Sequence, residues 1–541
     1  MNKVATYLRG HVSGEVSTRD DVREAMSVDG GILKLTPDMV IYPRHTNDVR
    51  KVARFSWQLA EKGHVLPITV RGAGTDATGA AIGKGVSLVM TAHMNRIFEH
   101  DAKQKLTRLQ PGVTVGALES MLACHGASVM ALAGSHPYGT VGGAIASAVS
   151  GRLAGKYKTI EPAIDQLEVV LANGDVLQTK RLSKRELNKM KGVQGFVGDI
   201  YRGIDRIIEE YAEVLDGLRS NDATGYNTIA DVKQKDGSFD LTPLFVGSQG
   251  TLGIITEMIL RSEFRSLRTA IVSLVFDSSE KARDALDDIC KLNPAFVEYF
   301  DAELFETAAA CGREYGFYKT AAQEFTPASV VLVGFDDFSD RQRAKYLKKI
   351  QRLFAKTPGV VTDSRDGEAA EGTLAALSVA HYTRWPDKKG ESSPDVFGGF
   401  YVPTDRLEDF VKALTALSHK EHLSLPLSGH AYTNIYSVHP VFSLSKVGDK
   451  QKIFKLMGEI TELVHSHGGT MIAEGAEGRL KAKFVYDQLD EKTVAMYEEV
   501  RNVCDPQGTL NPGVKQVNDL RTMAGMLHDK HEVAGSARFG L

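Results

Sequence analysis

Hydrophobic and polar positions along this chain follow two periods, one typical of strands and one typical of helices. Short continuous apolar runs predict buried strands, and they lie at 65–70, 86–90, 270–276 and 330–335. Apolar residues at helical spacing predict amphipathic helices over 195–219, 278–292, 341–356 and 491–504. Thr46, Asn47 and Asp48 are predicted to cap one more helix, in which Val49, Val52, Ala53 and Trp57 share a face. The chain is therefore expected to be α+β.

Local signals refine three segments. Asn173-Gly174, between the runs 164–172 and 176–179, is the preferred type I′ turn and predicts a β-hairpin. The basic residues of the 341–356 helix are expected to form a solvated face, and they include Arg341, Arg343, Lys348 and Lys349. Near the C-terminus, 518–528 is expected to be a docked helix and 531–541 to be frayed.

The segment RGAGTDATG, Arg71 to Gly79, is a glycine-rich loop between two of the predicted strands. Gly72 and Gly74 permit close backbone approach and a positive φ, so that successive N–H groups can converge on phosphate oxygens. The loop is neither GxGxxG nor a P-loop, because no Gly-Lys-Ser/Thr follows and the next element is a predicted strand. By itself it indicates either an anion cradle or a structural turn.

Three further clusters of small residues follow in order. Residues 137–144 read PYGTVGGA and lead into small residues through Gly151, residues 247–257 read GSQGTLGIITE, and residues 505–513 read DPQGTLNPG. A stretch without large side chains suits a flat ring system lying against the backbone. In this order the four clusters resemble the FAD-binding fold of the vanillyl-alcohol oxidase and p-cresol methylhydroxylase superfamily. From Pro43 to Lys515 the chain looks like that superfamily's D-lactate dehydrogenase and glycolate oxidase FAD-subunit branch.

The resemblance implies an α+β fold in two parts. A p-cresol methylhydroxylase-type FAD-binding domain would occupy 1–264. A cap domain of the FAD-linked oxidase C-terminal type, an antiparallel sheet with helices, would occupy 265–490 and lie over the flavin to contact the substrate. Residues 491–516 would then return the chain to the FAD domain, and 517–541 would form a tail.

The resemblance also implies FAD as the cofactor. Family members that tether flavin through this loop resemble RxGGHS, and Thr75 stands here in place of the histidine, so non-covalent FAD is expected. Arg71 is expected either beside the pyrophosphate or in an ordinary salt bridge. The residues expected to bind FAD are Pro43, Arg71, Gly72, Ala73, Gly74, Thr75, Asp76, Pro111, Gly112, Pro137, Gly139, Thr140, Gly142, Gly143, Ser147, Gly151, Gly250, Gly253, Ile255 and Asn511.

Composition narrows the class of ligand. The chain has 541 residues, 43% hydrophobic and 25% charged, which is enough to bury a sizeable core in more than one domain. Lys plus Arg at 65 nearly balance Asp plus Glu at 68. That balance argues against nucleic acid or anionic lipid as the partner and favours a small molecule.

Cysteines and apolar runs bear on the compartment. Cys124, Cys290, Cys311 and Cys504 form no CxxC pair, which argues against structural zinc, iron-sulfur ligation and a disulfide framework. No apolar run approaches the ~20 residues that span a bilayer, and the N-terminal MNKVATYLRGHVSGE lacks the apolar core of a signal peptide. We therefore expect a cytoplasmic protein, with a position peripheral to the inner face of the membrane as the alternative.

Oxidation of a 2-hydroxy acid needs a cation for the carboxylate and a base or metal that lowers the hydroxyl pKa. The cap domain is expected to supply both. Relatives that resemble W-x-x-R clamp the carboxylate with arginine, and Arg384 in HYTRW occupies that position, with a buried structural arginine as the alternative. The lysine of their K-x-D-V-x-x-P stretch is absent, because Phe397 and Gly399 replace its Lys and Asp.

Metal-dependent relatives resemble GHxGDGNxH followed later by GEHG. Here SGHAYTNIY keeps His430, loses the Gly-Asp-Gly turn and places Tyr436 near the second histidine, with His439 on the opposite parity of a regular strand. Glu474 is kept, but Gly475 replaces the histidine that follows it in the relatives. Two protein ligands make a poor catalytic metal site, so no bound metal is expected.

The expected catalytic residues are Arg384, His430, Tyr436 and Glu474, and the base is open between His381, His430 and Tyr436. The resemblance implies an FAD-dependent oxidoreductase, D-lactate dehydrogenase-like, that oxidises a small 2-hydroxy acid such as D-lactate or glycolate. Its electrons would pass to a quinone, a cytochrome or a partner subunit. The alternatives are an oxidase of a different alcohol without metal assistance, a flavin-binding partner subunit without turnover, and a non-catalytic scaffold. The intact flavin loops argue against the scaffold.

Overall fold

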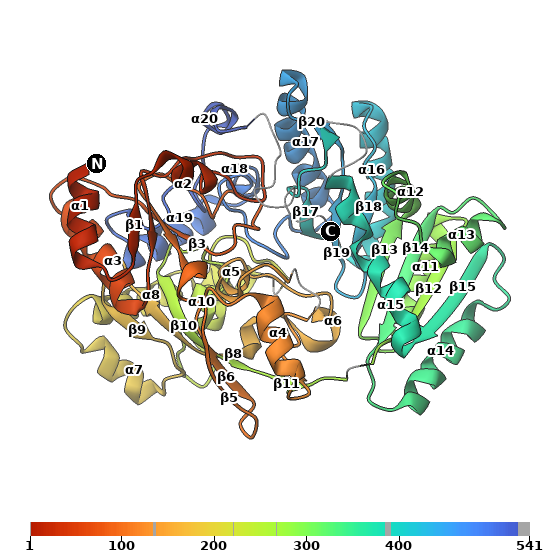
Figure 1. Cartoon of the computed structure of the whole chain (residues 1–541), viewed down its shortest axis with the longest axis horizontal. Coiled ribbons are helices and arrows are strands. Elements are labelled where there is room, and N and C mark those ends of the chain that lie inside the picture. Colours follow the sequence, from red (N-terminus) through yellow and green to blue (C-terminus); the bar gives the residue numbers. More distant parts are fainter. Residues whose placement is uncertain (1, 134–136, 220, 267, 385–390, 529–541) are drawn as a thin grey trace.

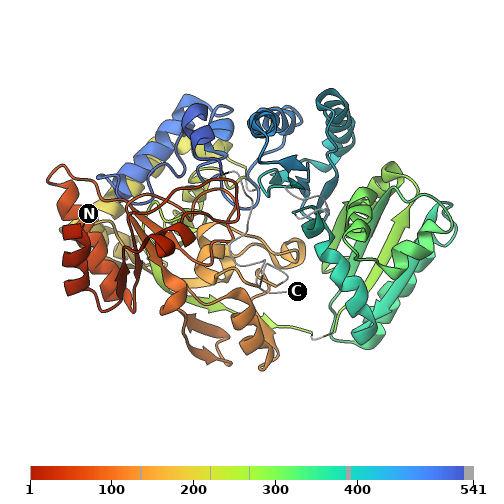
Figure 2. The same cartoon turned by 45° about the horizontal axis from the view of Figure 1, so that its top comes forward.

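A computed structural model describes residues 2–133, 137–219, 221–266, 268–384 and 391–528. Its elements form two lobes that lie beside each other (Figure 1). One lobe contains the N-terminal half of the chain and, from the C-terminal part, α18 (Ala482–Tyr486) and α19 (Glu491–Cys504). Figure 2 shows the same division after rotation, with the last helices packed on the N-terminal lobe. The chain therefore leaves the first lobe, builds the second and returns.

The first sheet, with strand order β1-β2-β4-β3, carries the glycine loop that follows β3. Its strands are β1 (Glu15–Ser17), β2 (Met39–Tyr42), β3 (Ile68–Arg71) and β4 (Val86–Val89). β2, β4 and β3 are parallel, so the connection from β2 to β3 needs the crossover helix α3 (Thr46–Ala60). Leu510 forms a parallel bridge to Ile68. The returning C-terminal segment thus extends this sheet beside β3.

The second sheet is antiparallel, with strand order β5-β6-β10-β8-β9. Its strands are β5 (Ile97–Asp101), β6 (Leu106–Leu109), β8 (Ile164–Val170), β9 (Val176–Gln178) and β10 (Ile254–Arg261). The short pair β7 (Ala127–Ser128) and β11 (Glu263–Phe264) lies beside the exit to the second lobe.

The helices of this lobe, other than α3, α18 and α19, are α1 (Asn2–His11), α2 (Asp20–Ala25), α4 (Val115–Ala123), α5 (Val141–Ala146), α6 (Ala154–Tyr157), α7 (Lys184–Lys191), α8 (Phe196–Glu210), α9 (Ala212–Gly217), α10 (Thr242–Phe245) and α20 (Leu520–Gly525).

The second lobe, which we call the cap lobe, is built on an antiparallel sheet with strand order β15-β12-β14-β13-β18-β19-β17. The strands are β12 (Ala270–Phe276), β13 (Phe296–Asp301), β14 (Ser329–Phe335), β15 (Val360–Asp366), β17 (Gly398–Tyr401), β18 (Leu427–His430) and β19 (Ile435–Val438), and a separate pair joins β16 (Glu391–Ser392) to β20 (Phe442–Ser443). The cap helices are α11 (Ser279–Cys290), α12 (Ala302–Ala310), α13 (Gly316–Ala322), α14 (Asp340–Phe354), α15 (Glu371–Leu374), α16 (Leu407–Glu421) and α17 (Val447–Ser466).

β12 is buried along its whole length because helices cover both of its faces. Val272 and Leu274 join the core that contains Ile289 of α11 and Ile350 of α14. Ile271 of the same strand joins the core under α12 and α13. A strand buried on both faces has no polar alternation, which is why its sequence is a continuous apolar run.

The strand expected at 270–276 coincides with β12, and the helix expected at 491–504 coincides with α19. The single helix expected over 195–219 is wrong: α8 ends at Glu210, and Tyr211 has φ −102° and ψ 24° before α9 begins. The cap expected from Thr46 to Asp48 is also wrong. The helix begins at Thr46 after His45, and the Asp48 carboxylate accepts backbone N–H groups from Ser13, Gly14 and Arg44.

The hairpin is present, with Val170 paired to Val176. Its turn is not type I′, because only Gly174 of the Asn-Gly pair has a positive φ, 84°. The prediction that the basic residues of 341–356 are solvated is wrong for Arg343, which is 1% exposed and pairs with Asp340 and Asp366. The docked helix expected near 518–528 is α20, and 531–541 lie outside the described residues. Within the described residues, no helix is long and apolar enough to cross a membrane.

Candidate active site

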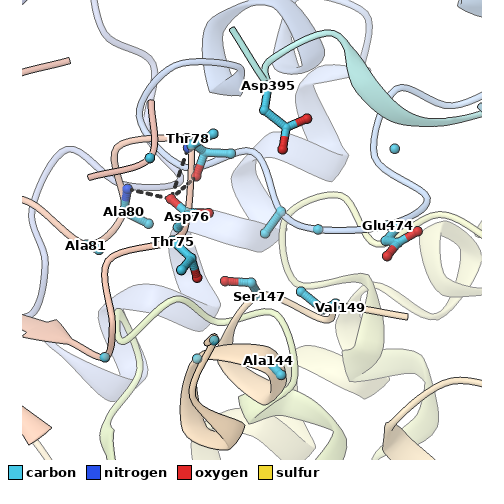
Figure 3. A pocket seen from close by; sticks show the side chains of 18 of the residues that line it. Thr75, Asp76, Thr78, Ala80, Ala81, Ala144, Ser147, Val149, Asp395 and Glu474 are labelled. Carbon is cyan, nitrogen blue, oxygen red and sulfur yellow. Dashed lines mark hydrogen bonds between the residues drawn. The ribbon is translucent and has the colours of Figure 1, made fainter. Parts of the chain in front are cut away.

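One cavity of about 1720 Å³ lies between the lobes. The glycine loops of the first lobe form one wall, and the cap sheet with the segment around Glu474 forms the other. Figure 3 shows Thr75 and Asp76 of the first loop, together with Ser147 and Val149, around the same space as Asp395 and Glu474. The volume exceeds that of ordinary small-molecule sites, so it has room for a dinucleotide and a second ligand.

The loop after β3 requires glycine at two positions. Gly74 has φ 75°, and a Cβ on it would clash with the guanidinium of Arg71. A Cβ on Gly72 would clash with the hydroxyl of Thr140. Arg71 lies folded beneath the loop, 6% exposed, and its Nη1 donates to the carbonyl of Ala81 at 3.3 Å. Arg71 therefore braces the loop while also lining the cavity.

Asp76 holds the next part of the loop in a tight turn. Its Oδ2 accepts the backbone N–H of Thr78 at 3.0 Å, the hydroxyl of Thr78 at 2.8 Å and the backbone N–H of Ala80 at 3.2 Å (Figure 3). Burial raises the pKa of the Asp76 carboxyl, although these hydrogen bonds act to lower it. Asp76 thus fixes the shape of the loop from within.

The other small-residue clusters interlock with this loop. Gly142 packs on Pro111 and donates its N–H to the Pro111 carbonyl at 3.0 Å. Gln249 has φ 50°, and its side chain accepts the N–H of Gly478 at 3.0 Å and donates to the hydroxyl of Thr78 at 3.2 Å. Gln249 was not among the residues predicted for the site, although it lies inside the glycine cluster GSQG.

The residues expected to bind FAD divide into two groups. Those that line the cavity are Arg71, Gly72, Ala73, Gly74, Thr75, Asp76, Pro111, Gly139, Thr140, Gly142, Gly143, Ser147, Gly151, Gly250, Gly253 and Ile255. Pro43, Gly112, Pro137 and Asn511 are not part of its lining. Asn511 stands behind the wall, where its amide donates to the carbonyls of Ala80 and Gln249, each at 2.8 Å. It supports the loops instead of facing a ligand.

Two features of the cavity fit FAD, one on the first wall and one on the opposite wall. The wall offers glycine backbone and short side chains over several consecutive loops, which suits close contact with a flat ring. At the edge of the cavity, a Cβ on Gly475 would meet no atom within 4 Å. FAD held here would contact the segments 71–76, 139–143 and 147–151.

On the cap wall, His430 lies between two carboxylates. Glu298 of β13 pairs directly with His430 of β18 across the sheet, and its Oε1 is 2.6 Å from His430 Nδ1. His430 Nε2 is 3.8 Å from Glu474 Oε2. Burial opposes the imidazolium, but Glu298 and Glu474 outweigh burial and raise the pKa of His430 to about 9, while the positive charge of Arg152 acts in the opposite direction.

Tyr436 does not reach this site, which corrects the expectation that it was catalytic. Ile435 and Ser437 of β19 line the cavity, whereas Tyr436 between them is 1% exposed and lies in the core. Successive strand residues point to opposite faces, so Ile435, Ser437 and His439 face the cavity and Tyr436 faces away from it. His439 Nε2 lies 2.7 Å from the hydroxyl of Ser428, and burial lowers the pKa of His439 to about 4.

Besides Arg71, three more cationic side chains line the same cavity. Arg384 forms an ion pair with Asp395, and its charge holds the pKa of the Asp395 carboxyl below the usual range. Lys481 is 5% exposed and donates to the carbonyl of Gly398 at 2.8 Å. Arg152 follows Gly151, and its Nε and Nη1 are buried without a hydrogen-bond partner in the described parts of the chain.

A metal ligand set would need three suitable side chains at one point. Among the described residues, no group of three or more His, Cys, Asp or Glu side chains is arranged to hold an ion.

Comparison with known proteins identifies both parts of the chain. A family model described as an FAD binding domain matches residues 37–180, and one described as FAD linked oxidases, C-terminal domain, matches residues 267–514. D-2-hydroxyglutarate dehydrogenase of Escherichia coli (strain K12) is 25% identical over 517 residues, which are 93% of this chain and 50% of that protein. This chain thus spans about half the length of the curated relatives it matches first. Glycolate oxidase subunit GlcD of Bacillus subtilis (strain 168) is 24% identical over 493 residues, which are 90% of this chain and 90% of that protein.

Solved structures show the same fold. 4-Ethylphenol oxidase from Gulosibacter chungangensis superposes with a TM-score of 0.68 at 15% identity, covering 96% of this chain and 98% of that one. Alkyldihydroxyacetonephosphate synthase gives a TM-score of 0.64 at 15% identity, covering 95% and 86%. The fold, the two matched domains and the cavity between them agree with the resemblance in the sequence. The chain thus combines a match to the FAD binding domain with a match to the C-terminal domain of FAD linked oxidases, and FAD is its cofactor.

Proposed function

We propose that this protein oxidises a small 2-hydroxy acid, of the D-lactate or glycolate type, and passes the electrons to an external acceptor. One observation carries the proposal: a single cavity brings together the glycine wall, the imidazole of His430, and the cations Arg152, Arg384 and Lys481. The names of the relatives, D-2-hydroxyglutarate dehydrogenase and glycolate oxidase subunit, support the substrate class.

His430 is the group that takes the hydroxyl proton. Its Nδ1 is hydrogen-bonded to Glu298 at 2.6 Å, so that Nε2 is the ring nitrogen on the side of Glu474. A proton that arrives on Nε2 is stabilised by both carboxylates, which is the relation expected of a general base with an orienting partner. FAD bound against the first wall supplies the acceptor for the hydrogen on C2.

The cavity also suits the acid group of the substrate. Arg152, Arg384 and Lys481 give it positive charge, and burial strengthens their attraction for a carboxylate. Leu377 and Ala380 contribute apolar lining near them, which suits a short carbon chain. The external acceptor is proposed to be a quinone, a cytochrome or a partner subunit.

Anaerobic titration of the flavin-loaded protein tests this function. D- and L-lactate, glycolate, and D- and L-2-hydroxyglutarate are added separately, and the oxidised flavin absorption band is followed. We expect one configuration of one acid to bleach the band, slowly in His430→Gln and at the wild-type rate in His419→Gln, a matched change on the exposed face of α16. If no acid bleaches a flavin that dithionite still reduces, the protein is a flavin-binding subunit without hydroxy-acid turnover.

A further inference from the structure

Arg152 is a cation of the cavity that has buried N–H groups without an acceptor among the described residues. Its Nε and Nη1 are each buried, and neither has a hydrogen-bond partner within the described residues. A buried guanidinium N–H without an acceptor costs free energy, so such groups are usually paired. The other cations of the cavity have partners, which are Asp395 for Arg384, the Gly398 carbonyl for Lys481 and the Ala81 carbonyl for Arg71. An anionic ligand would supply hydrogen-bond acceptors for these two N–H groups of Arg152.

Arg152 lines the same cavity as His430, the group proposed to take the proton. Its positive charge lowers the pKa of His430, against the two carboxylates. Two residues before it, Ser150 lines the cavity with Glu474, and its backbone N–H acts to lower the pKa of the Glu474 carboxyl. In a 2-hydroxy acid the carboxylate is bonded directly to the carbon that carries the hydroxyl. A cation and a base on adjoining parts of one cavity therefore match the two ends of such a substrate.

We propose that Arg152 binds the carboxylate of the hydroxy-acid substrate. Arg384, which the family resemblance assigns to that task, acts as a positioning residue through its ion pair with Asp395. The cation for the substrate then comes from the FAD-binding lobe, directly after Gly151, and not from the cap. This inference rests on the proposed function, because it assigns a residue to that substrate.

Oxalate binding tests the proposal without turnover, because oxalate has the carboxylate and no hydrogen to lose. Its dissociation constant is measured from the perturbation of the flavin spectrum in wild type, Arg152→Gln, Arg152→Lys and Arg384→Gln. Loss of a charge-assisted hydrogen bond is expected to weaken oxalate binding at least about 10-fold in Arg152→Gln. Arg152→Lys should recover part of the affinity, and Arg384→Gln should lose less than Arg152→Gln. Arg181→Gln, at an exposed ion pair of the first lobe, is the matched control and should bind oxalate like wild type.

The FAD content of each variant is measured beside the oxalate titration. Arg152→Gln with full FAD and wild-type oxalate affinity would overturn the proposal, as would a larger loss in Arg384→Gln. Loss of FAD from both Arg152 variants, with folded protein in circular dichroism, would assign Arg152 to the cofactor instead. In turnover, Arg152→Gln should raise KM for the hydroxy acid more than it lowers kcat. The proposed function fails separately, in the wild type, if no hydroxy acid bleaches the flavin.

Discussion

Replacing Glu298 with Gln should lower the pKa of His430 and leave the imidazole in place. The glutamine amide oxygen can still accept the Nδ1 hydrogen bond that Glu298 accepts at 2.6 Å. The change removes one negative charge beside the ring and leaves Glu474 in place. The groups that then set the charge of His430 are Glu474 and Arg152.

The size of the effect follows from the pKa of His430. A value of about 9 against the ordinary 6.5 corresponds to roughly 3 kcal/mol of net stabilisation of the imidazolium. Glu298 lies at 2.6 Å and Glu474 at 3.8 Å, so most of that stabilisation belongs to Glu298. We expect a pKa of about 7 in Glu298→Gln. At pH 7 the neutral, proton-accepting fraction of His430 then rises from about 1% to about half.

The assay is the pH dependence of kcat/KM for flavin reduction by the hydroxy acid, measured anaerobically from pH 6 to 10. In the wild type, kcat/KM should rise with pH and level off above about pH 9, because only neutral His430 accepts the proton. In Glu298→Gln the rise should end about 2 pH units lower, with a lower plateau because the base is weaker. Glu280→Gln on the exposed side of α11 is the control. Identical pH profiles for wild type and Glu298→Gln would refute His430 as the base.

The same pair contributes to the stability of the fold. Because the folded-state pKa of His430 is raised, the contribution is complete below about pH 6.5 and is lost as the pH rises through about 9. The difference in Tm between wild type and Glu298→Gln should therefore be largest at pH 6 and shrink by pH 9.

Four further outcomes are expected. Gly74→Val should fold but contain no FAD, because a Cβ at φ 75° clashes with Arg71; a flavin spectrum at wild-type occupancy would show that this loop does not hold FAD. Acid precipitation should release FAD into the supernatant, because Thr75 cannot tether it as histidine does; flavin that stays on the pellet would contradict this. Dialysis against a chelator should leave hydroxy-acid oxidation intact, with no stoichiometric zinc or manganese found by elemental analysis; one metal per chain lost together with activity would contradict this. Asp29 is buried with one unpartnered oxygen, and burial raises its pKa to about 8, so the wild type should lose Tm relative to Asp29→Asn as the pH rises from 5 to 8, and parallel Tm curves would disprove it.

Local backbone requirements explain why the first wall could be predicted from sequence. Gly74 has a positive φ and packs against Arg71 of its own loop, and Gly72 packs against Thr140 of the next small-residue cluster. Such requirements leave glycine in the sequence wherever the loop occurs. Asn511 and Pro43 belong to the same family pattern but lie outside the cavity lining, since the pattern does not distinguish a residue that faces a ligand from one that supports its wall.

Long-range strand register explains why the cap wall could not be predicted. Glu298 and His430 are 132 residues apart in the chain and meet only because β13 pairs with β18. Glu298 lies in an apolar run that indicates a strand but not its neighbour. Tyr436 was expected in the cavity because it stands near the second histidine of the relatives' motif, whereas the alternation along β19 places it in the core. Arg343 was misplaced for the same reason, because its partner Asp366 comes from β15.

The two walls divide the chemistry of the proposed reaction between them. The wall that fits FAD offers glycine backbone and short side chains such as Ser147 and Val149, which cannot act as a base (Figure 3). His430, with Glu298 and Glu474 beside it, belongs to the opposite wall. A substrate between them would give up its hydroxyl proton on one side and its C2 hydrogen on the other. Arg152 would hold the carboxylate where the first lobe meets the cap, so that neither transfer requires the substrate to move.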